Sequence, residues 1–529
     1  QAWSLQRGQR RQHGLPEYLT MRSAQAEWQR LTNKRQGFER RCERYANFTL
    51  PRLFTSENWD ENSDELSHDW QSVGAQAVNH VVNKLMLALF APSRPFMRLE
   101  ADPEWLATLP EGLTSSMVEE ALAEAERKAV KELDTLGEAR AKLYSALANL
   151  VALGNVLLEL PAERGESPDV YNLRDYVVRR TGKGKVKCLI IREVMEFDEL
   201  EQDVQAAVIA AGNRFKPDRT VSHFRRIELN SRGGYNMTQH IDTIKLPAEF
   251  DGAWSEETMP YRVLVWNLKR GNHYGTGLVE DYAGDFGGLS SLSEAQIKGA
   301  ILSSEYRWLV NPAGMTKVED LENSENGAAL PGQKDDVSLI ANSKASDLAI
   351  VQNIGQEYIQ RIGRGFLLGT AVTRDAERVT AQEIRMQAQE LETSFGGTYS
   401  QIAVDMQLPI ARWLLRNISM ELKDTQIKLS IITGLDALSR SGDLDALRAA
   451  LTDCGLVANV QNGLQRLNLG AIFQTIFAGH GLPANKYVKS DEQVAAEQQQ
   501  AMQAQSQQAM TEQAVAAGVE ANAQQGTRQ

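Results

Sequence analysis

The hydrophobic pattern of this 529-residue chain changes its period twice, and this constrains the fold more than any other feature. Apolar side chains recur at helical spacing up to residue 153, alternate over residues 156–266, and return to helical spacing from residue 278. These two periods are those of helices and strands. Because the strands are gathered between helical stretches, the pattern predicts a predominantly helical α+β fold and not an alternating α/β fold. The length exceeds one hydrophobic core, so we expect several packing units.

Helix and strand boundaries follow from the same pattern and from its Gly and Pro residues. We expect a helix ending at Gly154 in a left-handed cap, and one from Thr380 to about residue 419 that is interrupted at Gly396 and strained near Pro409. Residues 307–341 read as a short irregular piece. The other expected helices cover residues 21–48, 70–90, 113–136, 278–306 and 345–367, and the expected strands residues 156–160, 171–180, 185–192, 220–229, 235–246 and 261–266.

Charge is distributed unevenly along the chain. The net charge is −12, which argues against a protein that grips nucleic acid mainly by neutralising phosphates. Residues 1–52, however, carry eleven Lys and Arg against four Asp and Glu, so the remaining residues carry a formal −19. This basic N-terminal arm can be interpreted in two ways. It is either a solvated helix face with a free tail, or a segment that contacts DNA or an acidic neighbour.

Motifs of common enzymes are absent from the sequence. There is no Walker-type phosphate loop and no Gly-x-Ser-x-Gly elbow. The seven histidines show no metal-ligand spacing, and the three cysteines are scattered, so we expect no metal and no other cofactor. The longest strongly apolar run, residues 85–91, is far shorter than the roughly 20 residues that a membrane span needs. A non-enzymatic protein is favoured, although distant residues could still assemble a catalytic site.

Several stretches resemble the portal (head-to-tail connector) family of short-tailed, podovirus-type bacteriophages. They occur in family order across about residues 40–450, and the ordered set is more specific than any single stretch. The most specific ones lie at residues 377–385, which read Glu-Arg-Val-Thr-Ala-Gln-Glu-Ile-Arg, and at residues 390–400. The others lie at residues 70–75, 84–90, 97–99, 152–158, 310–314, 433–438 and 443–444.

The resemblance implies a ring of about twelve copies around a central channel, built from wing, stem, clip and crown regions. On that plan the coarse pattern divides into a basic arm at 1–39, an α+β wing at 40–277, stem helices at 278–306 and 342–367 and a clip between them at 307–341. A channel loop at 368–379, a long wing helix at 380–419, a crown at 420–489 and a Gln- and Ala-rich tail at 490–529 complete it.

The first stem helix is acidic. Glu280, Asp281, Asp285 and Glu294 lie in it together with Glu305, against Lys298 alone. If these acids line the channel, they repel phosphates and keep sliding DNA from sticking. The alternative is that they face solvent outside the stem. Gly287 and Gly288 each cost a helix roughly 1 kcal/mol, so we expect this helix to start later or to bend there.

The channel loop is the best candidate for a site that holds DNA. It contains Thr373, Arg374 and Arg378, and Leu368 precedes its glycine. The resemblance implies that Arg374 matches a family loop position that is also Arg, where a ring of guanidinium groups would contact phosphates. The alternative is that Arg374 pairs with Asp375 or Glu377 of a neighbouring copy.

As a portal, the chain would be a homo-oligomer in the virion, at one capsid vertex, and would lie in the host cytoplasm during assembly. Its partners would be double-stranded DNA, the terminase motor, a tail adaptor, and the capsid, scaffolding and internal core proteins. The competing readings are another phage ring component, such as a tail adaptor or an internal core protein, and an enzyme such as a hydrolase. The order of stem helix, clip and stem helix argues against the first, and no residue constellation supports the second.

Overall fold

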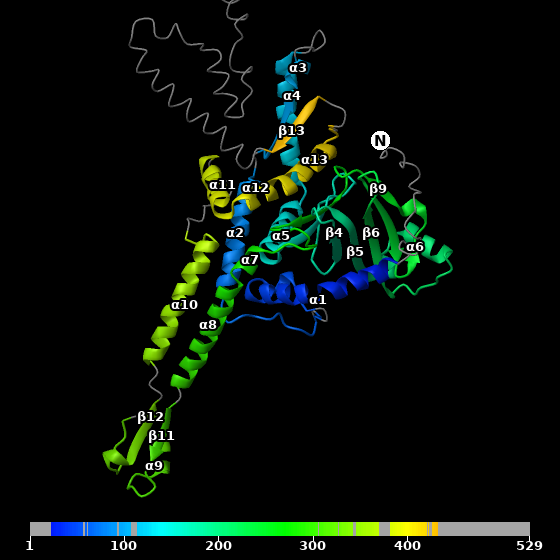
Figure 1. Ribbon diagram of the computed structural model, residues 1–529. Coiled ribbons are helices and arrows are strands. Elements are labelled where there is room, and N and C mark those ends of the chain that lie inside the picture. The colour runs from blue at the N-terminus through cyan, green and yellow to red at the C-terminus, as the bar shows by residue number, and fades with distance from the viewer. Residues whose placement is uncertain are drawn as a thin grey trace, which may run out of the picture. The chain divides into compact units, whose positions relative to one another are not determined.

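The computed structural model (Figure 1) describes residues 23–56, 59–60, 62–92, 95–106, 114–304, 306–325, 327–341, 345–369, 381–420, 422 and 426–431. These residues fall into two compact units. The larger unit takes its residues from 1–92 and 133–413, and the smaller from 93–132 and 414–529.

The larger unit contains most of the helices and strands. Its helices are α1 (Ala24–Phe48), α2 (Val73–Leu89), α5 (Ala139–Leu153), α6 (Gln202–Ala210), α7 (Leu278–Asp281), α8 (Ala283–Ser304), α9 (Val318–Glu322), α10 (Ala345–Gly365), α11 (Ala381–Phe395), α12 (Gly397–Ile402) and most of α13 (Leu408–Asn417). Its strands are β2 (Asn155–Glu159), β3 (Asp169–Tyr171), β4 (Tyr176–Arg180), β5 (Val186–Glu196), β6 (Thr220–Leu229), β7 (Tyr235–Ile241), β8 (Ile244–Lys245), β9 (Gly252–Trp254), β10 (Tyr261–Val265), β11 (Tyr306–Val310) and β12 (Val337–Ala341).

Antiparallel pairing joins these strands into three sheets. The largest has the order β4-β5-β6-β7-β8, with β9 beside β7, and a second has the order β10-β2-β3. The third is the pair β11-β12. The smaller unit contains α3 (Pro103–Leu106), most of α4 (Ser115–Thr135) and an antiparallel pair of β1 (Met97–Ala101) with β13 (Ile427–Ile431). The predicted α+β fold, rich in helix, is confirmed.

Helix α1 covers one face of the largest sheet. The Ser23 hydroxyl caps its first turn by accepting the backbone N–H of Ala26, and Trp28 and Leu31 lie on one face at helical spacing. These two side chains pack against a cluster from β4, β5 and β6 that includes Phe224, whose ring centroid is 6.0 Å from that of Trp28. The helix predicted at residues 21–48 is therefore confirmed, and it runs through the boundary expected at residue 39 between arm and wing.

Helix α6 packs with residues from the opposite face of β6. Val204 and Val208 of α6 contact Val221 of β6, whereas Phe224 of the same strand contacts α1. Successive side chains of a strand alternate between faces, so residues three apart must point to opposite sides. The sheet is therefore covered on both faces.

The backbones of Gly154 and Gly277 approach each other closely where α5 ends. Gly154 has φ +76° and caps α5 with its N–H on the Asn149 and Leu150 carbonyls, as the sequence predicted. A Cβ on Gly277 would lie 2.7 Å from the Gly154 nitrogen. Both positions therefore need glycine, Gly154 for its left-handed backbone and Gly277 for the close approach.

Helices α8 and α10 lie side by side (Figure 1). They run antiparallel, since Gly288 of α8 faces Tyr358 of α10 and the later Gly299 faces the earlier Leu348. A Cβ on Gly288 would lie 2.9 Å from the Tyr358 ring, and one on Gly299 would lie 2.8 Å from Leu348. The helix expected to start later or to bend at Gly287 and Gly288 is divided at Tyr282 into α7 and α8. The long helix α8 therefore starts later than residue 278, at Ala283, but before the two glycines, and it continues through both of them.

Residues 307–341, expected to be irregular, contain the antiparallel strands β11 and β12, which pair Val310 with Val337. The expected turn after β11 is present, with the Gly314 N–H on the Asn311 carbonyl. The prediction of an irregular segment is therefore wrong. The sequence pattern did not reveal these strands, because each is short and its partner lies far away in the chain.

Residues 171–180, expected to be one strand, form β3 and β4 in different sheets. The Asp175 N–H bonds the Asn172 carbonyl, and the Asp175 carboxylate accepts the Asn172 N–H, so a local turn separates them.

The helical segment that begins after Thr380 is broken where the sequence predicted. Gly396 has φ +57° and separates α11 from α12. Residues Ala403–Gln407 form a π-helical turn directly before α13, and Pro409 follows at its start. Because Pro409 has no N–H to donate, the regular hydrogen-bond ladder is lost there. Both expected irregularities are confirmed.

Aromatic rings pack where α8 and α10 meet α1. The Phe366 centroid lies 5.3 Å from Tyr282 and 5.6 Å from Phe286, and Phe286 in turn stacks on Phe48 at 6.4 Å. A Cβ on Gly365 would overlap the Tyr282 ring. Phe366 packs against that ring, so moving the ring aside would break this aromatic contact.

We predict that Gly365→Ala lowers the thermal unfolding midpoint, with a cost of about 1–3 kcal/mol from overpacking. Gly355→Ala serves as the control, because a Cβ on Gly355, in the middle of α10, would meet no atom within 4 Å. It should raise the midpoint, because Ala favours helix over Gly by about 1 kcal/mol. Equal shifts for the two variants would contradict the packing argument.

Candidate channel site in the stem helices

Three of the four predicted acidic residues form ion pairs within the chain. Asp285 pairs with Arg361 of α10 at 3.4 Å, and Glu294 pairs with Lys298 at 2.6 Å. Glu280 lies 3.7 Å from Arg41 of α1. The sequence of residues 278–306 contains only Lys298 to offset these acids. In the folded chain, Arg41 and Arg361 from other helices provide two further cations.

Asp281 differs from the other three acids. Within the described part of the chain it has no ion-pair partner, and its side chain is exposed. Partial burial nevertheless raises the pKa of the Asp281 carboxyl above its usual value. Of the four, Asp281 is the carboxylate that presents the least compensated negative charge.

Helices α8 and α10, the predicted stem helices, expose large apolar side chains. Ile350 of α10 is 58% exposed, and Leu302 and Ile301 of α8 are 56% and 55% exposed. Ile297 of α8 and Ile354 of α10 are also exposed. Monomeric soluble proteins rarely expose contiguous apolar surface of this kind, and such surface marks a contact with another molecule.

The second stem helix ends in a strained residue that α2 holds in place. Leu367 has φ +58°, a left-handed conformation that costs a non-glycine residue about 1 kcal/mol or more. Its carbonyl lies 2.9 Å from the His80 Nε2 atom, and the following Leu368 N–H bonds the Gly363 carbonyl at 2.8 Å. Burial lowers the pKa of His80, and Lys84 lowers it further, which favours the neutral ring.

Helix α2 also holds α11. The Lys84 ammonium, 5% exposed, donates to the Glu390 carboxylate at 2.6 Å. His80 and Lys84 are four residues apart and share one face of α2. One helix therefore contacts both elements that flank residues 368–379.

Of the predicted channel-loop residues, Leu368 is described and is partly buried. Thr373, Arg374 and Arg378 lie outside the described residues. The role of Arg374 therefore stays a prediction.

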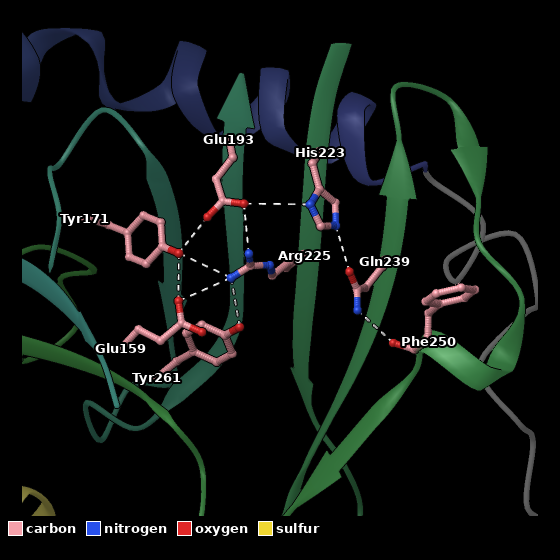
Figure 2. Close-up of polar contacts among 8 residues, drawn as sticks. All are labelled: Glu159, Tyr171, Glu193, His223, Arg225, Gln239, Phe250 and Tyr261. Atoms are coloured by element: carbon pink, nitrogen blue, oxygen red, sulfur yellow. Dashed lines mark hydrogen bonds and ion pairs between the residues drawn. The ribbon is translucent and has the colours of Figure 1, made fainter. Parts of the chain in front are cut away.

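A polar cluster that the sequence pattern did not reveal joins the two larger sheets (Figure 2). Arg225 of β6 bonds Glu193 of β5 at 2.9 Å and Glu159 of β2 at 3.2 Å. The Tyr171 hydroxyl lies 2.6 Å from Glu193 and 2.7 Å from Glu159, and Tyr261 accepts from Arg225 at 3.1 Å. The sequence offered one indication of this cluster, the adjacent Arg225 and Arg226 within the alternating pattern of the β6 strand.

The same cluster contains the groups that an enzyme site would use. Burial raises the pKa of both the Tyr171 and the Tyr261 hydroxyls, which keeps them protonated. Burial and the charge of Arg225 lower the pKa of His223. Both carboxylates are bonded to Arg225 and Tyr171, so the arrangement ties the two sheets together.

Neither a metal-binding cluster nor a membrane-spanning helix occurs in the part of the chain that the structure describes. Among these residues, no group of three or more His, Cys, Asp or Glu side chains is placed to hold a metal ion. No helix in the same part of the chain is both long enough and apolar enough to cross a membrane.

The chain can now be compared with known proteins. A family model described as bacteriophage head to tail connecting protein matches residues 21–488. The chain belongs to this family, and the predicted α+β portal protein, a virion component at the connection of head and tail, is confirmed.

Its relatives are structural proteins of short-tailed phages. The portal proteins of Enterobacteria phage T3 and Escherichia phage T7 are each 33% identical to it, and each alignment covers 90% of this chain and 90% of the relative. The portal protein of Enterobacteria phage SP6 is 30% identical over 89% of this chain and 91% of its own length. A solved chain from the neck of an empty gene transfer agent particle is similar with a TM-score of 0.36 and 15% identity, over 72% of this chain and 86% of that one.

We predict that Arg225→Ala lowers the free energy of unfolding by about 3 kcal/mol, because Glu159 and Glu193 lose their shared cation. Lys245→Ala, which removes an exposed cation from β8, is the control and should change it by less than about 0.5 kcal/mol. Urea unfolding followed by circular dichroism measures both. Equal effects would show that the cluster does not stabilise the junction of the sheets.

Proposed function

We propose that about twelve copies of this chain close into a ring whose stem helices surround a channel for double-stranded DNA. The observation that carries this is the exposed apolar surface of α8 and α10, which includes Ile301 and Ile350. A head-to-tail contact between neighbouring copies would bury these side chains, whereas a monomer leaves them in water.

The channel would work by electrostatics and without catalytic chemistry. Asp281, repeated around the ring, would present a belt of carboxylates that repels phosphates during sliding. The paired acids Glu280, Asp285 and Glu294 would contribute less, because Arg41, Arg361 and Lys298 offset their charge. We assign these three mainly to holding the stem.

Genome retention would depend on the segment 368–379. In the proposed arrangement Arg374 forms a ring of guanidinium groups around the DNA, assisted by Thr373 and Arg378, with Leu368 at the root of the segment. Its support is the family membership and the anchoring of both flanking elements on α2 through His80 and Lys84. Arg suits this role because its charge persists at all physiological pH values.

The remaining partners would bind at two places. The segment 307–341 would meet the terminase motor during packaging and the tail adaptor afterwards, and its exposed Trp308, Leu309 and Met315 support a docking role. The wing and crown would face capsid, scaffolding and internal core proteins. Assembly would take place in the host cytoplasm, and the ring would occupy one capsid vertex in the virion.

We predict that Ile350→Glu prevents ring formation and leaves the chain folded. Burying an unpaired carboxylate costs more than about 2 kcal/mol at each interface, and this cost recurs around the ring. Gln352→Glu adds the same charge at an exposed polar position of α10 and should assemble normally. Negative-stain microscopy and sedimentation velocity measure the outcome. Normal rings from Ile350→Glu would contradict assembly through this surface.

We predict that capsids carrying Arg374→Ala package DNA but lose it, whereas Arg374→Lys retains part of the genome because one charge per copy remains. Quantifying packaged DNA after incubation at raised ionic strength measures retention, since screening weakens phosphate contacts. Full retention in Arg374→Ala capsids with normal rings would refute the valve role.

A further inference from the structure

Two exposed loops of the wing carry cations that have no acidic partners. The turn between β4 and β5 contains Lys183, and the loop between β10 and α7 contains Lys269 and Arg270. Lys34 is exposed on α1. We name these four residues the wing cation patch. Within the described part of the chain none of the four forms an ion pair, although the chain as a whole has a net charge of −12.

Arg180 holds the two loops together. Its guanidinium donates to the Gly184 carbonyl at 3.0 Å, to the His273 carbonyl at 3.1 Å and to the Val263 carbonyl at 3.1 Å. Its backbone N–H also donates to His273 Nδ1 at 3.2 Å. The loops that carry Lys183, Lys269 and Arg270 are therefore fixed relative to one another and need no ordering when a ligand binds.

Tyr274 joins α1 to the same assembly. Its hydroxyl accepts the Val178 N–H of β4 at 3.1 Å, and its ring stacks on Phe38 of α1 at 5.1 Å. Arg35 of α1 also donates to the hydroxyl at 3.3 Å. The charge of Lys34 acts on His273 of the loop between β10 and α7, so α1 brings a fourth cation to the loops.

The local potential is positive. Burial lowers the pKa of His273, and the charges of Arg179, Arg180 and Lys34 lower it further. Of the acids nearby, Glu27 pairs with Arg30 and Glu256 pairs with Lys185. Asp405 interacts with Arg180 itself, and not with the four cations of the patch. Four unpaired cations thus remain available to an external anion.

We propose that the wing cation patch binds the phosphate backbone of double-stranded DNA at a site separate from the channel loop. An acidic protein partner fits less well, because the exposed large apolar side chains of the described residues lie outside both loops, and protein interfaces have apolar cores. Gly182, Gly184 and Gly271 keep the loops free of bulk, so the cations reach a backbone without obstruction. The contact is independent of base sequence.

The test uses assembled rings of the full chain and a covalently closed DNA minicircle, which cannot thread the channel. Four phosphate contacts predict that log K falls with log salt concentration at a slope of about −3.6. The variant with Lys34→Gln, Lys183→Gln, Lys269→Gln and Arg270→Gln should bind more than tenfold more weakly with a flatter slope. The control Arg214→Gln with Lys216→Gln removes two exposed cations from the loop between α6 and β6 and should bind as the parent does.

Three outcomes would overturn the proposal. They are equal binding by the patch variant and the parent, loss of binding in the control as large as in the patch variant, and tighter binding of polyglutamate than of the minicircle. If the fourfold variant does not assemble, Lys183→Gln and Arg270→Gln are measured singly, and each should reduce the slope by about 1. An unchanged slope in both would also refute it. Failure here leaves the valve role of Arg374 untouched, because the minicircle does not enter the channel.

Discussion

The close approach of α8 and α10 is the contact on which the arrangement of this helix pair depends. Glycines at three contact points allow the side chains of the opposite element to fill the space that a Cβ would occupy. Gly288 receives Tyr358, Gly299 receives Leu348 and Gly365 receives Tyr282. Each glycine weakens its own helix by about 1 kcal/mol, and the packing that it permits offsets that loss. The pair is held together from within, and Ile350 of α10 stays exposed on its surface.

A second consequence of this packing is that the stem is rooted in the body of the molecule. Phe366 at the end of α10 packs against Tyr282 and Phe286, and the next residue, Leu367, bonds His80 of α2. Lys84 of α2 holds α11. Helix α2 therefore contacts both Leu367, at the end of α10, and α11.

Charge in this protein is local, and the net value of −12 conceals it. Glu280 of α7 pairs with Arg41 of α1, and Asp285 of α8 pairs with Arg361 of α10, whereas the loops around Arg180 keep cations without ion pairs among the described residues. Screening at physiological ionic strength limits the reach of each group to about 8 Å. Local arrangement, and not net charge, therefore decides the sign of the charge at each part of the surface.

The sequence by itself determined the features that depend on near neighbours. The left-handed cap at Gly154, the break at Gly396, the irregular turn before Pro409 and most strands follow from local backbone preferences. The family was also readable from ordered motifs. The tertiary structure decided the pairing of β11 with β12, the ion-pair partners of Glu280 and Asp285, and the Arg225 cluster. These contacts join residues far apart in the chain, and no local pattern encodes which distant side chain will arrive. For the same reason the acidic stem residues were identifiable from sequence, but their neutralisation was not.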